Sequence, residues 1–152
     1  MKVYIYSQKD VEELLKTDRF PKNVGIINIG DVPDKRSADY KSPTKDFLLL
    51  HCDIHGIFLH DIEIDKFEEY GLTKDTYFPR VDRTAFFIKR MYSNGCDIVC
   101  YSRNGKSRSP ACAAAILEFY YNNGSSIFTD NRYTPNKLIY DKLLDALRKE
   151  NI

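Results

Sequence analysis

The sequence predicts a single-domain α/β sandwich in which helices flank a central, mainly parallel sheet. Strand-like and helix-like segments alternate along the 152 residues, and this order favours parallel strands joined by helices. Two strand-like segments, 23–30 and 96–101, are apolar over most of their length, as strands buried on both faces are. A chain of this length can bury one substantial core, so we expect residues 1–152 to form one domain.

The N-terminal segment predicts a strand that passes directly into a helix. Residues 2–7 alternate in the manner of a strand, and apolar residues at helical spacing follow over 7–18. Ser7 is the candidate N-cap of this helix, with Asp10 three residues further on. The apolar segment 23–30 then predicts the second strand.

The next part of the chain predicts a loop, a third strand and a long connection. Residues 31–45 are polar and contain proline and serine, which indicates a loop. The run DFLLLHCD, residues 46–53, predicts a strand that ends at Asp53. The pattern of residues 53–73 is mixed, and a connection of this length is often functional.

The C-terminal half predicts a fourth strand and three helices. Apolar residues three and four apart predict a helix over 76–93, and residues 96–101 form the strand-like run that follows it. Residues 109–121 predict a helix rich in alanine. Residues 134–150 predict an amphipathic helix that begins with Thr134 as its cap.

Composition excludes several classes of function. The 23 basic and 22 acidic residues nearly cancel, so we expect neither nucleic acid nor a membrane surface as partner, and any anion site must be local. The four cysteines form no CxxC pair, which favours reduced and mostly buried thiols. No segment has the length of apolar sequence that a membrane span needs, and the N-terminus lacks the apolar stretch of a signal peptide. We therefore expect a cytoplasmic protein.

The segment IVCYSRNGKSRSP, residues 98–110, has the character of a phosphate-binding loop. A buried strand breaks into a loop with Gly105 and Arg108, and a helix then begins. Backbone N–H groups at such a junction carry partial positive charge and bind oxyanions. Arg108 can fork two phosphate oxygens, and the hydroxyls of Ser107 and Ser109 can orient the loop. The sequence thus predicts a site for inorganic phosphate or another oxyanion.

A nucleotide-binding loop is the first alternative for this segment. CYSRNGKS differs from the pattern GxxxxGK[ST] only by Cys100 in place of the first glycine. The missing glycine, the arginine at position 108 and the lack of a second acidic strand motif for Mg²⁺ all disfavour nucleotide hydrolysis.

The same loop resembles the signature of the cysteine-dependent protein tyrosine and dual-specificity phosphatases. That signature is a nucleophile, five residues, an arginine and then serine or threonine. Here the nucleophile position is Ser102, and Tyr101 stands where the family usually has histidine. Residues 107–119 and 131–147 are similar to the matching segments of small bacterial phosphatases of the dual-specificity type, and the resemblance extends over about residues 46–148.

The resemblance implies a role for each residue of the signature, without a cofactor or metal. Arg108 would hold the equatorial oxygens at the transition state, and Ser109 would assist the leaving nucleophile. The implied phosphate cradle consists of Arg103, Asn104, Gly105, Lys106, Ser107 and Arg108.

A carboxylic acid on a separate loop would protonate the leaving group. Asp53 is preferred because it follows the predicted strand 46–53, and Asp61 is the alternative. A metal site of histidine, cysteine and aspartate within HCDIH, residues 51–55, is disfavoured because neighbours along a strand point to opposite faces.

Serine at position 102 decides whether the chain is active. A cysteine in such a loop has a pKa of roughly 3.5 to 7.5, whereas a serine hydroxyl stays protonated without a base. We therefore expect the chain to be nearly inactive as a phosphatase but to bind phosphate normally. Two interpretations remain, a phosphatase whose cysteine was replaced to trap substrate and a natural pseudophosphatase. The expected partner is a phosphorylated protein or peptide, with phosphotyrosine first, and a non-protein phosphate ester is a third possibility.

Overall fold

Over residues 1–32 and 41–149, which the computed structural model describes, four parallel strands form one sheet. The strands are β1 (Val3–Ser7), β2 (Gly25–Gly30), β3 (Asp53–Phe58) and β4 (Ile98–Ser102). Their order across the sheet is β1-β4-β2-β3, so β4 is central and β3 lies at an edge. Ser102 at the end of β4 lies beside Ser7 on one side and Ile29 on the other. The predicted parallel α/β fold is confirmed.

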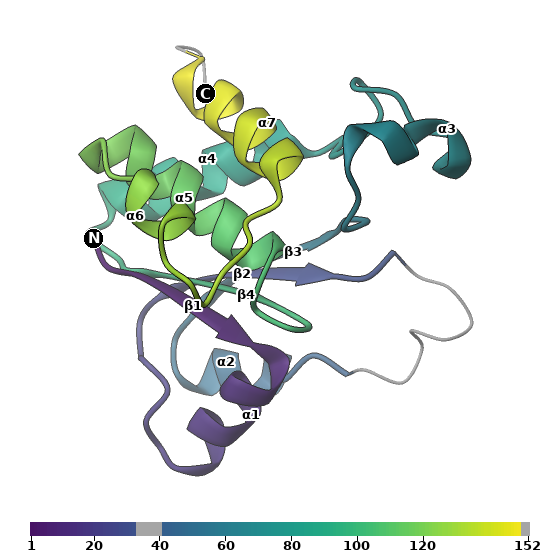
Figure 1. The fold of residues 1–152 in the computed structure, drawn as a ribbon. Helices are drawn as coiled ribbons and strands as arrows, with labels where there is room; N and C mark the ends of the chain where they lie inside the picture. Colours follow the sequence, from purple (N-terminus) through teal and green to yellow (C-terminus); the bar gives the residue numbers. More distant parts are fainter. Residues whose placement is uncertain (33–40, 150–152) are drawn as a thin grey trace.

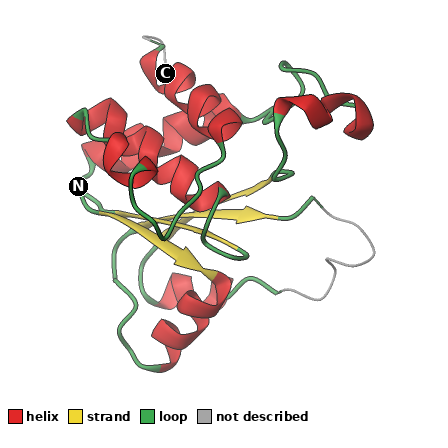
Figure 2. Cartoon of the chain, viewed as in Figure 1, coloured by secondary structure: helices red, strands yellow, loops and turns green. Residues whose placement is uncertain are grey.

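Helices cover both faces of the sheet. They are α1 (Gln8–Lys16), α2 (Thr44–Leu49), α3 (Phe67–Tyr70), α4 (Val81–Ser93), α5 (Arg108–Tyr121), α6 (Ser125–Phe128) and α7 (Lys137–Arg148), with a 3₁₀ turn at Ile64–Lys66. Helices α1 and α2 lie on one side of the sheet, and α4, α5 and α7 lie on the other (Figure 1). Figure 2 shows the same three layers as helices on either side of the strands.

Each face of the sheet contributes to its own hydrophobic core. On β2, Ile27 and Ile29 belong to the larger cluster with α4, α5 and α7, while Ile26 belongs to the smaller cluster with α1 and α2. On β4, Cys100 and Val99 divide in the same way. Because side chains alternate along a strand, both faces need apolar residues. This two-sided burial explains the continuous apolar runs.

The strand predicted over residues 46–53 is wrong. Residues 44–49 form α2, which buries Phe47 but leaves Leu48 and Leu49 62% and 70% exposed. The left-handed backbone of His51, with φ of 59°, ends this segment. Asp53 therefore begins the third strand instead of ending it.

The other elements lie close to their predicted positions. Ser7 and Asp10 form the expected capping box at α1. Helix α4 begins at Val81, five residues later than predicted. Asn136, and not Thr134, caps α7, because its side-chain oxygen accepts the N–H of Ile139 at 3.1 Å. No helix in the described part of the chain combines the length and the apolar character needed to cross a membrane.

Candidate active site

The loop of residues 103–107 joins β4 to α5 and packs on the junction of β1 and α1. Gly105 has a φ of 66°, and a Cβ there would lie 2.7 Å from the backbone nitrogen of Ser7. Both the backbone angle and this close approach require glycine. The N–H of Gln8 donates to the carbonyl of Arg103 at 3.3 Å. The loop is therefore fixed by the N-terminal strand.

The segment before α7 holds the other side of the loop. The N–H of Thr134 donates to the carbonyl of Lys106 at 2.8 Å, and the N–H of Asn136 donates to the carbonyl of Ser107 at 3.1 Å. Together with the bond from Gln8, these bonds anchor the loop by backbone contacts to two distant parts of the chain.

The N–H groups of the loop are left available. Among the described residues, no acceptor is bonded to the N–H groups of residues 104–108. Residues 104–108 line a cavity of about 290 Å³ together with Asp61 and Ser102. Unpaired N–H groups at the start of a helix attract an anion. The predicted cradle residues Asn104, Gly105, Lys106, Ser107 and Arg108 thus surround one cavity.

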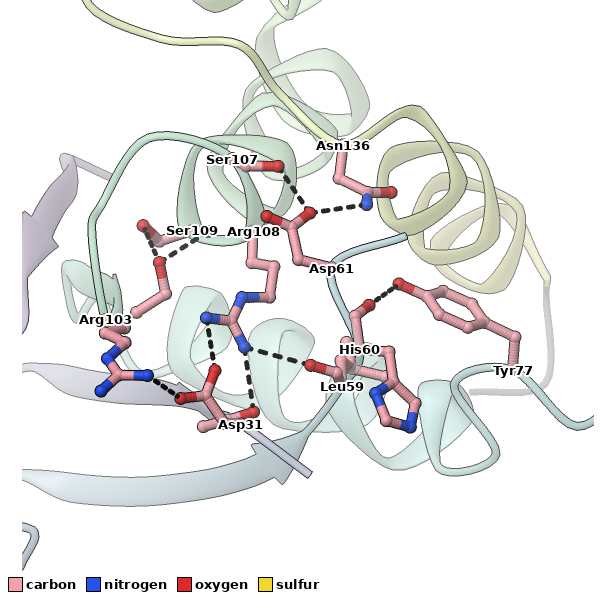
Figure 3. A network of polar contacts seen from close by, with 12 residues as sticks. Asp31, Leu59, His60, Asp61, Tyr77, Arg103, Ser107, Arg108, Ser109 and Asn136 are labelled. Atoms are coloured by element: carbon pink, nitrogen blue, oxygen red, sulfur yellow. Dashed lines mark hydrogen bonds and ion pairs between the residues drawn. The ribbon is translucent and has the colours of Figure 1, made fainter. Parts of the chain in front are cut away.

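Arg108 is nearly buried, with 6% of its surface exposed, and its guanidinium is held at the ends of β2 and β3 (Figure 3). Nη1 donates to the carbonyls of Leu59 at 3.1 Å and Gly30 at 3.3 Å. Nη2 lies 2.8 Å from Oδ1 of Asp31. The second oxygen of Asp31 accepts a hydrogen bond from Arg103 Nη1 at 3.1 Å. Asp31 therefore bridges two guanidiniums beside the cavity.

Asp61 lies against the loop on the other side (Figure 3). Its Oδ1 accepts hydrogen bonds from the hydroxyl of Ser107 at 2.7 Å and from Nδ2 of Asn136 at 2.9 Å. The hydroxyl of Tyr77 donates to the carbonyl of His60 at 2.7 Å and so fixes the preceding residue. Burial raises the pKa of Tyr77, which keeps its phenol protonated as a donor. The carboxylate is thus positioned by three other segments.

Ser102 lies at the base of the cavity and is 2% exposed. Its hydroxyl donates to Oγ of Ser109 at 3.0 Å and accepts the N–H of Ser109 at 3.4 Å. Two residues earlier, a hydrogen bond with Cys112 and complete burial raise the pKa of Cys100. That thiol cannot supply a thiolate in place of Ser102.

Tyr101, which stands where the phosphatase signature has histidine, belongs to the opposite core. Its ring packs edge-on against Phe47, with 6.0 Å between ring centroids. Side chains alternate along β4, so Tyr101 and Ser102 face different sides of the sheet.

Asp53, the preferred candidate acid, does not reach this site. It pairs with Gly25 at the start of β2, and Gly25 pairs with Ile98 at the start of β4. Ser102 lies four residues further along, roughly 13 Å at the rise of a strand. The expected placement of Asp53 is therefore wrong: the sequence predicted that the third strand ends at Asp53, but β3 begins there. The carboxylate that lines the cavity at the loop is that of Asp61.

The neighbouring histidines of HCDIH lie elsewhere too. His51 precedes β3 in an exposed turn, and Nε2 of His55 lies 2.8 Å from the hydroxyl of Thr84 on α4. Across the described ranges, no group of three His, Cys, Asp or Glu residues is arranged to hold a metal ion.

Sequence reasoning missed two residues of the site, Asp31 and Asn136. Asp31 follows β2 directly, so the rule that sites lie beyond the carboxyl ends of parallel strands could have identified it. Asn136 is a good helix cap by type, but its second role, donating to Asp61, depends on tertiary structure.

Comparisons with known proteins find similarity in structure alone. No family model and no curated protein matches the sequence. The chain is similar to PTPMT1, solved in complex with PI(5)P, with a TM-score of 0.57 and 12% identity over 97% of this chain and 90% of that one. Human DUSP28 gives a TM-score of 0.56 and 14% identity, covering 95% of this chain and 90% of its own. The human tyrosine phosphatase-like serine/threonine/tyrosine-interacting protein gives 0.55 and 17%, covering 91% and 83%.

Proposed function

Because the chain has the fold of the dual-specificity and protein tyrosine phosphatases, we propose that it binds phosphomonoesters in the loop 103–108 and that its phosphatase chemistry is arrested at Ser102. The observation that carries the proposal is the set of unpaired N–H groups of residues 104–108 around a cavity with Ser102 at its base. Several N–H groups and one buried arginine match the oxygens of a phosphate.

The surrounding residues fit the remaining roles. Arg108 holds two equatorial oxygens through the edge of its guanidinium that is now shared with Asp31. Asp61 is the general acid that protonates the leaving oxygen, in place of Asp53, because it lines the cavity. In the active form of this chemistry a thiolate attacks phosphorus, the ester oxygen leaves with the proton of Asp61, and water then cleaves the phosphocysteine.

Ser102 blocks the first step. Its proton is hydrogen-bonded to Ser109, whose hydroxyl is not a base. Among the described residues no histidine or carboxylate is hydrogen-bonded to Ser102. A serine without a base is a poor nucleophile at neutral pH, so the rate falls by several orders of magnitude. Binding is retained because the N–H groups and Arg108 do not depend on the sulfur.

The proposed ligand is a phosphorylated protein or peptide, with phosphotyrosine first. The two interpretations of the chain, a natural pseudophosphatase and a phosphatase whose cysteine was replaced by serine, imply the same binding site. They differ only in whether the natural residue at position 102 is serine or cysteine. A non-protein ester is the alternative ligand, and PI(5)P in the PTPMT1 complex makes a phosphoinositide the compound to test beside phosphopeptides.

Calorimetric titration with tungstate, a phosphotyrosine peptide and a soluble phosphoinositide tests the binding site. Arg108→Lys keeps the charge but loses the fork, so affinity for all three should fall about tenfold or more. Arg148→Lys is the matched control and should leave the three affinities unchanged, because Arg148 is an exposed residue of α7 and lies outside the cavity lining. Equal affinities in Arg108→Lys and the unchanged protein would overturn the assignment.

A further inference from the structure

A second groove lies between the edge strand β3 and helix α4. Its volume is about 560 Å³, and it is lined by His55 and Gly56 of the strand and by Phe86 of the helix, among others. None of its lining residues lines the cavity at the phosphate loop. Phe86 is 56% exposed, which gives the groove an apolar contact at the surface. This groove is therefore a separate feature of the molecule.

The groove is positively charged. It is lined by Arg80 at the N-cap of α4 and by Arg83 and Arg90 within the helix, at spacings of three and seven residues. All three are exposed, and none is paired with a carboxylate in the described ranges. The single carboxylate of the lining, Asp82, lies 3.5 Å from Nζ of Lys149. Three guanidiniums are thus available for an acidic ligand.

The pKa of His55 is affected by burial and by the positive charge of the same three arginines. Its ring stacks on Phe87, with 5.2 Å between centroids, and is bonded to Thr84. Burial, followed by the charges of the three arginines, lowers the pKa of His55. The ring is therefore neutral at pH 7, and the positive charge of the groove comes from the arginines.

Among the described residues, the strand beside the arginines, β3, has no neighbouring strand on its outer edge. The N–H groups of Asp53 and Leu59 point toward β2, because they donate to Val24 and Gly30 at 3.1 Å. Backbone groups alternate along a strand, so those of Ile54, Gly56 and Phe58 point away from the sheet. A Cβ at Gly56 would meet no atom within 4 Å. Strand edges are commonly protected by lysine or proline, and the sequence DIHGIF of β3 contains neither.

We propose that this groove binds an extended acidic segment of a partner protein, which adds a strand to the edge of β3 and pairs its carboxylates with Arg80, Arg83 and Arg90. The charge selects acidic side chains, and the open edge selects an extended backbone. Alternate residues of an added strand face the same side, so acidic residues two apart would point together toward α4. Phosphate in the loop is not part of this interaction.

The probe is a fluorescent peptide of about ten residues in which glutamate alternates with valine, measured by fluorescence anisotropy. We expect saturable binding at low ionic strength that weakens as salt is added. The triple variant Arg80→Glu, Arg83→Glu and Arg90→Glu should bind about tenfold more weakly or worse. The matched control makes the same charge change at exposed lysines of the α1 and α2 side, Lys16→Glu, Lys22→Glu and Lys45→Glu, and should bind as the unchanged protein does.

Two further peptides test the backbone pairing. A peptide N-methylated at alternate residues cannot complete the ladder and should bind more weakly, and the peptide with lysine for glutamate should not bind. In nuclear magnetic resonance spectra, the acidic peptide should shift the amide signals of Ile54, Gly56 and Phe58. Absence of saturable binding, equal binding by the triple variant or by the N-methylated peptide, or equally strong arginine-dependent binding of DNA or anionic vesicles would each overturn the proposal. Thermal unfolding of both triple variants checks that they are folded.

Discussion

Asp31 carries a negative charge at a site proposed for a dianion. Its carboxylate contacts Arg108 at 2.8 Å and Arg103 at 3.1 Å. A bound phosphate would compete for the same guanidinium and would be repelled by the carboxylate. Arg108 also donates to the carbonyls of Leu59 and Gly30, so it keeps its position without Asp31. The repulsion should therefore outweigh the loss of one positioning contact.

The variant Asp31→Asn should consequently bind tungstate several-fold more tightly than the unchanged protein, because one unfavourable charge pair is removed. Calorimetric titration measures the change. Asp145→Asn, which removes an exposed carboxylate on α7, is the matched control and should leave the affinity unchanged. Weaker binding by Asp31→Asn would show that the carboxylate positions the arginine more than it opposes the ligand.

Alanine substitutions at Gly105 and Gly71 distinguish the cost of backbone strain from the cost of a steric clash. Both have left-handed backbone angles, with φ of 66° and 67°. A Cβ at Gly71 meets no atom within 4 Å, whereas one at Gly105 lies 2.7 Å from the backbone of Ser7. Gly71→Ala should lower the free energy of unfolding by about 1 kcal/mol through strain alone. Gly105→Ala should lose at least about 1 kcal/mol more and weaken tungstate binding. Urea unfolding of the two variants measures the difference, and equal losses would contradict the packing at Ser7.

Single residues of the site were predictable where they lie in one continuous segment. The cradle from Asn104 to Arg108 is local in sequence, and the strand and helix around it were predicted at the right place. The carboxylate beside the loop, Asp61, was predicted only as the alternative to Asp53, because the choice depended on where the preceding strand ends. Asp61 and Asp31 meet the loop only through the tertiary fold.

At the scale of the elements, α7 connects helix capping to the candidate acid. Asn136 accepts the N–H of Ile139 through Oδ1 and donates to Asp61 through Nδ2. Asn136→Ala should lower the free energy of unfolding by about 1 kcal/mol or more, because it removes the cap. Asn136→Asp keeps a capping oxygen and places a second carboxylate beside Asp61.

Because the added carboxylate favours the protonated form of Asp61, Asn136→Asp in a Ser102→Cys background should move the alkaline limb of the pH–rate profile upward by about one pH unit. Steady-state kinetics with an aryl phosphate measure this. An unchanged alkaline limb would exclude Asp61 as the acid.

The incorrect prediction of the third strand shows that a short apolar segment does not by itself distinguish a strand from a helix. DFLLLHCD is short and apolar, and such a run fits a buried strand or a helix equally well. Its first four residues belong to α2, in which Leu48 and Leu49 are exposed. The true strand, β3, contains histidine and glycine and lies at the sheet edge, half in contact with solvent. An edge strand need not be apolar on both faces, so its sequence carries a weak signal.

At the scale of the whole molecule, three distant parts of the chain meet at one loop. The β1–α1 junction packs under Gly105, the residues after β3 contribute Asp61, and the segment before α7 bonds to the loop carbonyls. All lie at the carboxyl edge of the parallel sheet, where ligands of this architecture bind. The groove on β3 and α4 shares none of this lining. The two proposed ligands, a phosphate and a partner segment, would therefore not compete for the same residues.

The proposed arrest of phosphatase chemistry at Ser102 is tested by the rate of p-nitrophenyl phosphate hydrolysis of Ser102→Cys, compared with that of the unchanged protein. A thiol at this position lies among unpaired N–H groups beside Arg108, conditions that favour the thiolate. We expect turnover that vanadate inhibits in Ser102→Cys and a rate at least about a thousandfold lower in the unchanged protein. A folded Ser102→Cys protein that binds tungstate but shows no vanadate-sensitive turnover would contradict the proposal.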